Sequence, residues 1–308
     1  EYFFMDTYLP LFQDLRLQVK LGQFPKLWRC PECESVKIDM EKRQWSLDKN
    51  DSSDDFTNIL RKLIPLHIPI DYFEGYNTLK RISEKNSWPN SPKGIFTSVA
   101  YSKDDVFKIW AANKVEFGAS LIIGQHGGHF GTSSLSFDES HQMKIADKFI
   151  SWGWEDPNIS IIKPVGNLKE FNTKVNYSSK GFALLVETEL PQYSYHLRAV
   201  PISSQMLYYF EEQYNFVNAL PLALQEQVLV RLPGKTSLGD FNWSSELRWQ
   251  DRSPNVRIDS RKQTIKSLVK DVRIVISTVN STSLLESLIW NVPTIIFWDV
   301  KYWELKES

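Results

Sequence analysis

The sequence predicts an α/β protein made of two doubly wound domains. Short apolar, β-branched runs such as residues 272–276 (VRIVI) are typical of strands that are buried on both faces of a parallel sheet. From residue 92 onward these runs alternate with segments of helical periodicity, which indicates parallel, doubly wound sheets. A chain of 308 residues is also longer than the chains that usually fold around a single hydrophobic core. We place the boundary in the Pro- and Gly-marked connection 161–169, which gives domains 1–165 and 166–308.

The first domain is predicted to begin with a helical layer over residues 1–90. Residues 9–21 have an amphipathic helical pattern, and a second helix is expected from Phe56 to Leu63, after the polar loop 49–55. Regular alternation begins beyond Pro92. The expected order is strand 94–100, helix 104–115, strand 119–124, helix 138–147 and strand 148–154.

The second domain repeats this alternation and ends in a β-α-β unit. Strand 272–276 is followed by a helix that carries Leu284 and Leu288 at helical spacing and ends before Pro293, and a strand then runs to Trp298. The preceding elements are expected at strand 181–189, helix 203–220, strand 227–232, strand 255–259 and helix 263–270.

Composition narrows the class of protein. The hydrophobic fraction of 42% and the charged fraction of 24% are those of a soluble globular protein. A formal net charge of −1 argues against nucleic acid as the main partner. No apolar run approaches the roughly eighteen residues of a membrane span. The two cysteines, Cys30 and Cys33, have neither a second pair nor a histidine at zinc-finger spacing, so we interpret them as a structural or incidental pair in a reducing cytoplasm.

A histidine- and glycine-rich loop follows the predicted strand 119–124. Its candidate residues are Gln125, His126, Gly127, Gly128 and His129. Ligands bind beyond the carboxyl ends of strands in such sheets, and glycines let the backbone approach a ligand closely. His126 can take a proton from a hydroxyl near neutral pH, whereas His129 is better suited to binding or orienting; a hydrogen-bonded turn histidine is the alternative. The two histidines lack helical metal-ligand spacing, so we expect no metal site.

A second polar turn joins the strand and helix of the last β-α-β unit. Hydroxyls, an amide and free backbone N–H groups at a helix N-terminus make an anion site, and ordinary N-capping by Ser281 or Ser283 is the alternative. Glu286, one turn into the helix, is placed to reach a ribose or sugar hydroxyl. Arg231 and Lys235, near the end of strand 227–232, can hold a phosphate, although a solvated strand end is an equal alternative for Lys235. The candidate residues of the turn are Ser277, Thr278, Asn280, Ser281 and Thr282.

Four stretches carry a resemblance to a known family. WPNSPKGIFTS (88–98), LIIGQHGGHFGT (121–132), ADKFISWGW (146–154) and STVNSTSLLESLIWNVPTIIFWDVKYWEL (277–305) resemble a bacterial family of transferases from O-antigen and surface-polysaccharide gene clusters. The likeness extends from about Tyr72 onward. The order of elements also resembles GT-B glycosyltransferases, which implies two Rossmann-like domains that face a central cleft.

The resemblance implies a metal- and cofactor-independent glycosyltransferase that moves a sugar from a nucleotide-sugar donor to a glycan or lipid-linked glycan acceptor. GT-B enzymes with CMP- or CDP-activated donors have a His-Gly element in the first domain and a Ser/Thr-rich phosphate turn in the second. By this resemblance His126 is the base or acid, and Ser281 and Thr282 hold phosphate. The implied location is the cytoplasm, with peripheral contact at the inner membrane as a further expectation.

Three alternatives remain open. A CDP-polyol-type phosphotransferase uses the same anion turn. A nucleotide-sugar epimerase of the same fold needs further acid and base carboxylates, and a non-catalytic protein binds nucleotide-sugar or glycan alone. GT-B proteins usually continue with helices that cross back to the first domain, so we expect the natural chain to extend beyond Ser308.

Overall fold

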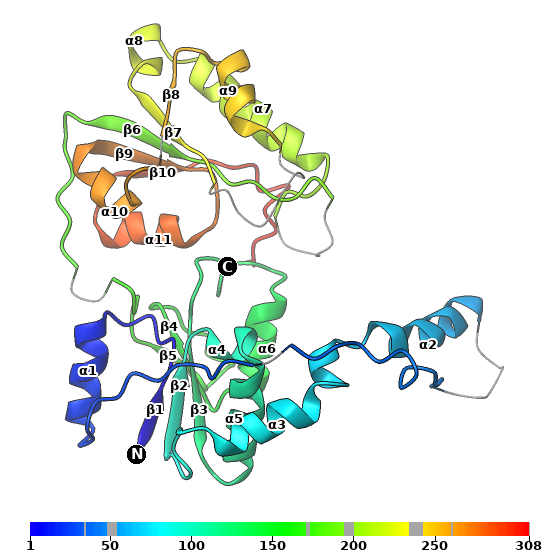
Figure 1. Ribbon diagram of the computed structural model, residues 1–308. Coiled ribbons are helices and arrows are strands. Elements are labelled where there is room, and N and C mark those ends of the chain that lie inside the picture. Colours follow the sequence, from blue (N-terminus) through cyan, green and yellow to red (C-terminus); the bar gives the residue numbers. More distant parts are fainter. Residues whose placement is uncertain are drawn as a thin grey trace. The chain divides into compact units, whose positions relative to one another are not determined.

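The computed structural model describes residues 1–33, 35–47, 54–170, 173–193, 200–233, 243–259 and 261–307. In these residues the chain forms two five-stranded sheets, with strand orders β1-β2-β3-β4-β5 and β10-β9-β6-β7-β8 (Figure 1). The registered neighbours, such as β2 with β3 and β6 with β9, run parallel. The predicted α/β class with parallel, Rossmann-like sheets is confirmed, while the GT-B arrangement stays a prediction.

The chain divides into two compact units that interleave in sequence. Unit 1 comprises Glu1–Gly124 and Ala146–Ile150, and unit 2 comprises Gln125–Ile145 and Ser151–Ser308. The histidine- and glycine-rich loop therefore belongs to unit 2, although it directly follows a strand of unit 1. The boundary proposed at 165/166 stays a prediction.

Unit 1 is built around a strongly aromatic core. The rings of Trp28, Trp88 and Trp110 lie 5.5, 5.3 and 4.5 Å from that of Phe3, which is fully buried in the first strand. Every residue of β2 is buried, as expected for a strand covered on both faces. The elements of this half are β1 (Tyr2–Phe4), α1 (Leu11–Lys20), α2 (Asp55–His67), η1 (Ile70–Tyr72), α3 (Tyr76–Lys85), β2 (Gly94–Thr97), α4 (Ala100–Lys103), α5 (Asp105–Glu116), β3 (Ser120–Gly124) and β4 (Lys148–Ser151), and the edge strand of the first sheet is β5 (Ile162–Pro164).

The predicted helical layer over residues 1–90 is only partly helical. It supplies α1, α2, η1 and α3, but Tyr2–Phe4 forms strand β1, which pairs in parallel with β2 from Tyr2↔Gly94 to Phe4↔Phe96. Three apolar residues are too few to show a strand period, and their pairing with residues more than ninety positions away decides the conformation.

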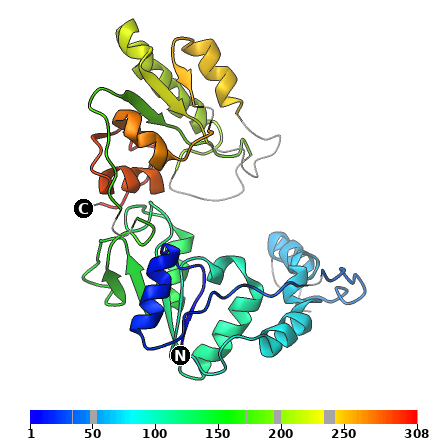
Figure 2. The same ribbon diagram turned by 60° about the vertical axis from the view of Figure 1, so that its left-hand side comes forward.

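Unit 2 is a doubly wound sheet with helices on both faces. Figure 1 and Figure 2 show α7 and α9 on one face and α10 and α11 on the other. Helix α7 buries Met206, Phe210 and Val217 against the central strands, at the spacing of one helical face. Its elements are α6 (Phe137–Ile145), β6 (Phe182–Val186), α7 (Gln205–Asn218), α8 (Leu222–Gln225), β7 (Val228–Arg231), α9 (Ser245–Arg252), β8 (Arg257–Ile258), α10 (Ile265–Leu268), η2 (Val269–Asp271), β9 (Val272–Ser277), α11 (Thr282–Ile289) and β10 (Thr294–Ile296).

The order of strands in unit 2 contains a topological switch point. From β6 the chain adds β7 and then β8 on one side, whereas β9 lies on the other side of β6 and leads outward to β10. Connections that leave two neighbouring strands in opposite directions open a crevice beyond their carboxyl ends, where ligands bind in doubly wound sheets. The switch point of unit 2 therefore lies where Val186 of β6 pairs with Ser277 of β9.

None of the helices in the described ranges combines the length and the hydropathy needed to cross a lipid bilayer.

Candidate functional site

The histidine- and glycine-rich loop is held by a buried glutamine. Gln125 is fully buried; its Nε2 donates to the carbonyl of Gly127 at 2.6 Å, and its Oε1 accepts from the backbone N–H of Trp152 and the indole N–H of Trp154, both at 2.8 Å. Both ends of the amide are thus used inside the protein. Gln125 shapes the loop, and the surfaces that remain for a ligand belong to the residues after it.

Gly128 brings this loop into direct backbone contact with the Ser/Thr turn. A Cβ atom on Gly128 would lie 2.0 Å from the carbonyl carbon of Ser281 and 2.5 Å from the amide nitrogen of Thr282. Only glycine permits this approach, because no real side chain comes so close to a backbone. The contact is reinforced by Asn280, whose Nδ2 donates to Thr132 Oγ1 at 2.8 Å. Two motifs about 150 residues apart in sequence therefore lie against each other within unit 2 and together make up the candidate site.

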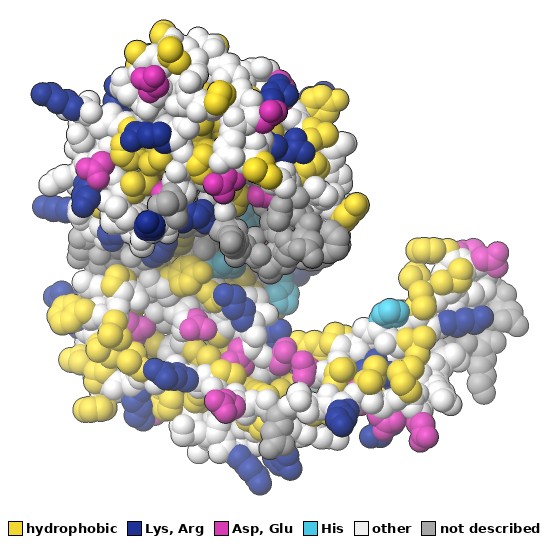
Figure 3. All heavy atoms as spheres, turned by 45° about the horizontal axis from the view of Figure 1, so that its top comes forward, with side chains coloured by type: hydrophobic (Ala, Val, Ile, Leu, Met, Phe, Trp, Pro, Cys, Tyr) yellow, Lys and Arg dark blue, Asp and Glu magenta, His cyan; other side chains and the backbone are white. Residues whose placement is uncertain are grey.

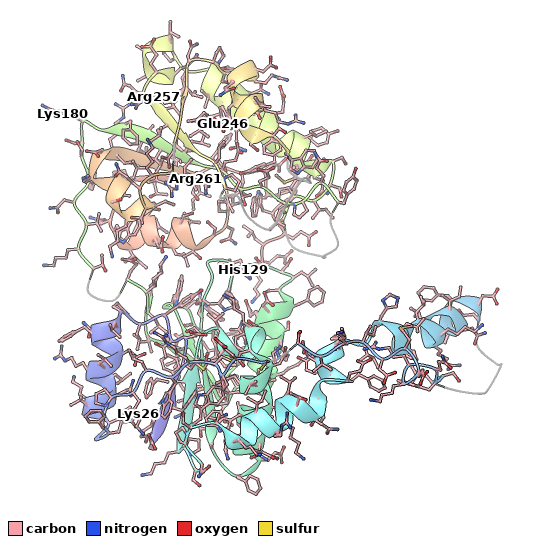
Figure 4. The ribbon with its side chains drawn as sticks, in the orientation of Figure 1. Lys26, His129, Lys180, Glu246, Arg257 and Arg261 are labelled. Carbon is pink, nitrogen blue, oxygen red and sulfur yellow. The ribbon has the colours of Figure 1, made fainter. Side chains whose placement is uncertain are left out.

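His126 and His129 are both half-buried and share one aromatic neighbour. The ring of Phe130 lies edge-on to His126 with centroids 5.0 Å apart, and 4.5 Å from His129 (labelled in Figure 4). Gly131 then turns the chain with a φ of +79° against the ring of Trp154, and its N–H donates to Glu139 Oε2 at 2.7 Å. The loop is consequently packed in place on both sides of the histidines.

The last described residues of the chain also fasten this loop. The N–H of Lys306 donates to the carbonyl of Thr132 at 2.8 Å, and its Nζ pairs with Glu139 Oε1 at 2.8 Å. Ser134 donates its N–H to the carbonyl of Glu304 at 2.9 Å. Segments 131–139 and 304–306 thus bind each other inside unit 2.

The first two residues of the Ser/Thr turn use their hydroxyls inside the fold. Ser277 Oγ donates to the carbonyl of Val279 at 3.1 Å, and Thr278 Oγ1 donates to the carbonyl of Val186 at 2.7 Å. Thr278 Oγ1 also lies 2.6 Å from the hydroxyl of Tyr209. Both residues are almost fully buried at the switch point, so they join β9 to β6 and leave the contact with a ligand to Asn280, Ser281 and Thr282.

The N-terminus of α11 has no side-chain cap. Ser281 occupies the N-cap position with φ −136° and ψ 177°, but its Oγ is paired with Ser283 Oγ at 2.8 Å instead of with a backbone N–H. Ser281 therefore does not cap the helix through its side chain, in contrast to the alternative considered from the sequence. Among the described residues, no side chain accepts from the first-turn N–H groups of α11; Leu284 donates to the carbonyl of Ser281 at 3.2 Å, which leaves the N–H groups of Thr282 and Ser283 as the ones an anion can use.

Two predicted donor-binding residues are engaged in ion pairs. Glu286 is buried and its carboxylate pairs with Lys169 Nζ, which is half exposed. Arg231, at the carboxyl end of β7, pairs with Asp259 and donates to the carbonyl of Gln263 at 3.2 Å. Glu286 and Arg231 remain candidates, but a ligand must compete with these partners. Lys235 lies outside the described residues.

Two functional candidates were not anticipated from the sequence. Arg261 (labelled in Figure 4) sits beside the Arg231–Asp259 pair with a φ of +56°, and burial, followed by the charge of Arg231, lowers the pKa of its guanidinium. Asp259 pairs with the guanidinium of Arg231 and accepts from the backbone N–H of Arg261 at 3.0 Å, so two guanidinium groups lie near one carboxylate and positive charge is in excess at this edge of the sheet. Glu187 follows β6 at the switch point and is 4% exposed. An acidic residue directly after the apolar run FALLV was the available signal for it.

No group of three or more His, Cys, Asp or Glu side chains that can hold a metal ion occurs in the described part of the chain. Metal independence stays a prediction. Cys30 and Cys33 are exposed free thiols.

Two parallel sheets, with the polar turn at the switch point of the second, define a Rossmann-like α/β protein with a candidate anion site in unit 2. The chain belongs to the LIC12162 family transferases, whose family model matches residues 1–308. No curated protein matches the chain. The family description indicates a transferase, and hence an enzyme; the resemblance drawn from the sequence motifs is confirmed at this level.

Proposed function

We propose that the protein is a glycosyltransferase that moves a sugar from a nucleotide-activated donor to a glycan acceptor of a surface polysaccharide such as O-antigen. The observation that carries this proposal is the backbone contact between Gly128 and Ser281. It places a loop with two histidines against an uncapped helix N-terminus at the switch point of a doubly wound sheet. A proton acceptor next to an anion site is what transfer from a phosphate-activated donor requires.

In this proposal the donor phosphate lies at the N-terminus of α11. The backbone N–H groups of Thr282 and Ser283 and the hydroxyls of Ser281 and Thr282 bind its oxygens, and the partial positive charge of the helix N-terminus favours the anion. The excess cation at Arg231 and Arg261 stabilises the remainder of the negative charge. These groups supply the positive charge that a divalent metal supplies elsewhere, in keeping with the metal independence we propose.

The chemical step is a substitution at the anomeric carbon of the sugar. His126 takes the proton of the acceptor hydroxyl, the acceptor oxygen forms a bond to the anomeric carbon, and the bond from that carbon to the donor phosphate oxygen breaks. The electron pair of the broken bond leaves with the nucleotide phosphate, whose charge the α11 turn stabilises. His129 contacts the same phenylalanine ring and positions the acceptor.

A thermal-shift screen with CMP, CDP, UDP, GDP and ADP, each with and without Mg²⁺, tests the donor site. A nucleotide that binds only the folded protein stabilises it by about 3 kcal/mol at one hundred times its Kd, which corresponds to a rise in Tm of roughly 5 °C or more. We expect one nucleotide to be selected, without a requirement for Mg²⁺, and the shift to be lost in the Ser281→Ala/Thr282→Ala variant.

Ser204→Ala is the matched control, because Ser204 stands at the N-cap of α7 and likewise makes no side-chain cap bond. It should leave the shift unchanged. His126→Ala should keep the nucleotide-induced shift and lose turnover. If no nucleotide shifts the Tm of the wild-type protein, the donor site is refuted; a His126→Ala variant with full turnover refutes the role of the base alone.

A phosphotransferase that uses a CDP-polyol donor is the second candidate, since the uncapped α11 N-terminus serves its phosphate equally well. The acceptor product separates the two: polyol-phosphate transfer from a CDP donor leaves a phosphodiester on the acceptor and releases CMP, whereas sugar transfer leaves a glycosidic bond and no phosphate on the acceptor.

A further inference from the structure

Helix α2 presents its apolar side to solvent and its polar side to its own chain. Thr57, Asn58 and Arg61 are half-buried and Pro65 is buried. The opposite side of the helix carries six apolar side chains that are 41–68% exposed, namely Phe56, Ile59, Leu60, Leu63, Ile64 and Leu66. A helix that packs on its own domain has the reverse orientation. Figure 3 shows hydrophobic side chains gathered on this projecting part of unit 1.

The orientation of α2 is fixed by a buried arginine. Arg43 is 2% exposed, and its Nη1 donates to the carbonyls of Pro65, Leu66 and Ile68 at 3.0, 3.2 and 2.8 Å, which satisfies the C-terminal end of the helix. Its Nε and Nη2 donate to the two oxygens of Glu74 at 2.6 and 2.5 Å. The apolar face therefore points outward because the polar face is anchored. Exposed apolar patches of this kind mark interaction surfaces.

The charges of α2 are distributed along its length. Asp54 caps the helix by accepting from the N–H of Thr57, and Asp55 follows in the first turn. The exposed basic side chains, Lys62 and His67, lie in the second half. An antiparallel pair of such helices brings each acidic first turn opposite the basic half of its partner while the apolar faces meet. A twofold axis makes both contacts at once, because the same surface is used on each copy.

A lipid surface matches this pattern less well. Helices that lie in the membrane interface carry cations along their polar face and are drawn to anionic lipid. In α2 the side chains Asp54 and Asp55 would be held against that surface, and Arg61 is half-buried against its own chain. The charge pattern thus favours a second copy of the chain over a membrane.

We propose that α2 is a self-association element, on which the α2 helix of a second copy of this chain docks in an antiparallel orientation. This surface lies in unit 1 and is separate from the candidate transferase site in unit 2. The proposal does not depend on the proposed reaction.

The test is the molar mass of the full chain by size-exclusion chromatography with light scattering, at up to about 100 µM, where even a contact of micromolar Kd is occupied. We expect a dimer for the wild type and a monomer for Ile59→Glu/Leu63→Glu, two exposed positions at which glutamate does not disturb the core. Phe117→Glu is the matched control, because Phe117 is 83% exposed at the end of α5 in the same unit; it should remain dimeric.

Charge reversal tests the antiparallel orientation. Asp55→Lys and Lys62→Glu should each weaken dimerisation roughly fivefold, as expected for loss of two exposed pairs, and the double variant should recover most of the affinity. A wild type that is monomeric throughout the concentration range overturns the proposal, as does a dimer that the Ile59→Glu/Leu63→Glu variant retains. A monomer that sediments with anionic lipid vesicles, and loses this binding in the same variant, identifies a membrane surface instead and also overturns it.

Discussion

We predict that Glu187 makes the stability of unit 2 dependent on pH. Its side chain is 4% exposed at the switch point, where Oε2 accepts from the indole N–H of Trp249 at 2.6 Å and Oε1 is buried without a hydrogen-bond partner among the described residues. Burial raises the pKa of this carboxyl to about 8, and the hydrogen bond from Trp249 only partly opposes it. The folded protein therefore holds Glu187 in its neutral form at pH 7.

The direction of the effect follows from the raised pKa. Below the ordinary value of 4.5 the carboxyl is protonated in both the folded and the unfolded chain, so folding bears no penalty there. As the pH rises toward 8, the unfolded chain ionises while the folded chain does not, and stability is lost progressively. One pKa unit corresponds to about 1.4 kcal/mol, so the raised pKa lowers the free energy of unfolding by about 5 kcal/mol in total. About 3 to 4 kcal/mol of this loss falls between pH 5 and pH 8.

The Glu187→Gln variant removes the titration while keeping a neutral, isosteric side chain. We expect the Tm of wild type and variant to be similar at pH 5, and the wild type to fall below the variant by on the order of 10 °C at pH 8. Differential scanning calorimetry at pH 5, 6, 7 and 8 measures this. Glu246→Gln, at an exposed glutamate on α9 of the same unit, is the control and should follow the wild type. A difference between wild type and Glu187→Gln that is the same at every pH would refute the reasoning.

Two further predictions concern the contacts that shape the molecule. Gly128→Ala should reduce turnover on the order of 100-fold and weaken the nucleotide-induced thermal shift, because relieving the 2.0 Å overlap with Ser281 displaces the loop and the turn by about an ångström or more. Unchanged turnover would show that the contact is dispensable. Arg43→Met should speed proteolysis within residues 35–75, because it leaves Glu74 buried without its cation and the C-terminal carbonyls of α2 without their donor. The Arg43→Met/Glu74→Met variant should recover part of the protection, because it removes the unpaired buried carboxylate as well. Limited proteolysis read by mass spectrometry checks this, and equal cleavage of wild type and Arg43→Met would contradict it.

The final β-α-β unit was predictable because its signals are local. The β-branched run of β9 and the leucines of α11 at helical spacing encode their own conformation, and Pro293 marks the end of the helix. Strand β1 lacked such a signal, since three residues acquire their strand conformation from β2. Helix α2 was predicted from the polar loop that precedes it, but its apolar face points outward because Arg43 anchors the opposite side, and a local helix signal does not encode which face is covered.

The candidate site was predictable in its parts but not in its connections. Glycine at position 128 signals a close approach of the backbone, yet Ser281 as the residue approached could be found only in three dimensions. The partners of two other predicted residues were also visible only in three dimensions: the hydroxyl of Thr278 donates to the carbonyl of Val186, and Glu286 pairs with Lys169. Polar residues after a strand indicate a possible ligand, and tertiary partners decide which of them are available to it.

The membership of the histidine loop in unit 2 has a consequence for the proposed reaction. Because Gly128 contacts Ser281, and Asn280 binds Thr132, the proposed proton acceptor and the proposed phosphate site are held by contacts inside one compact unit. The distance between the two therefore depends on packing inside unit 2, and a single substitution such as Gly128→Ala can change it. Catalytic groups placed in this way keep their relative geometry when substrate binds, which is the condition for proton transfer and departure of the phosphate to occur in one step.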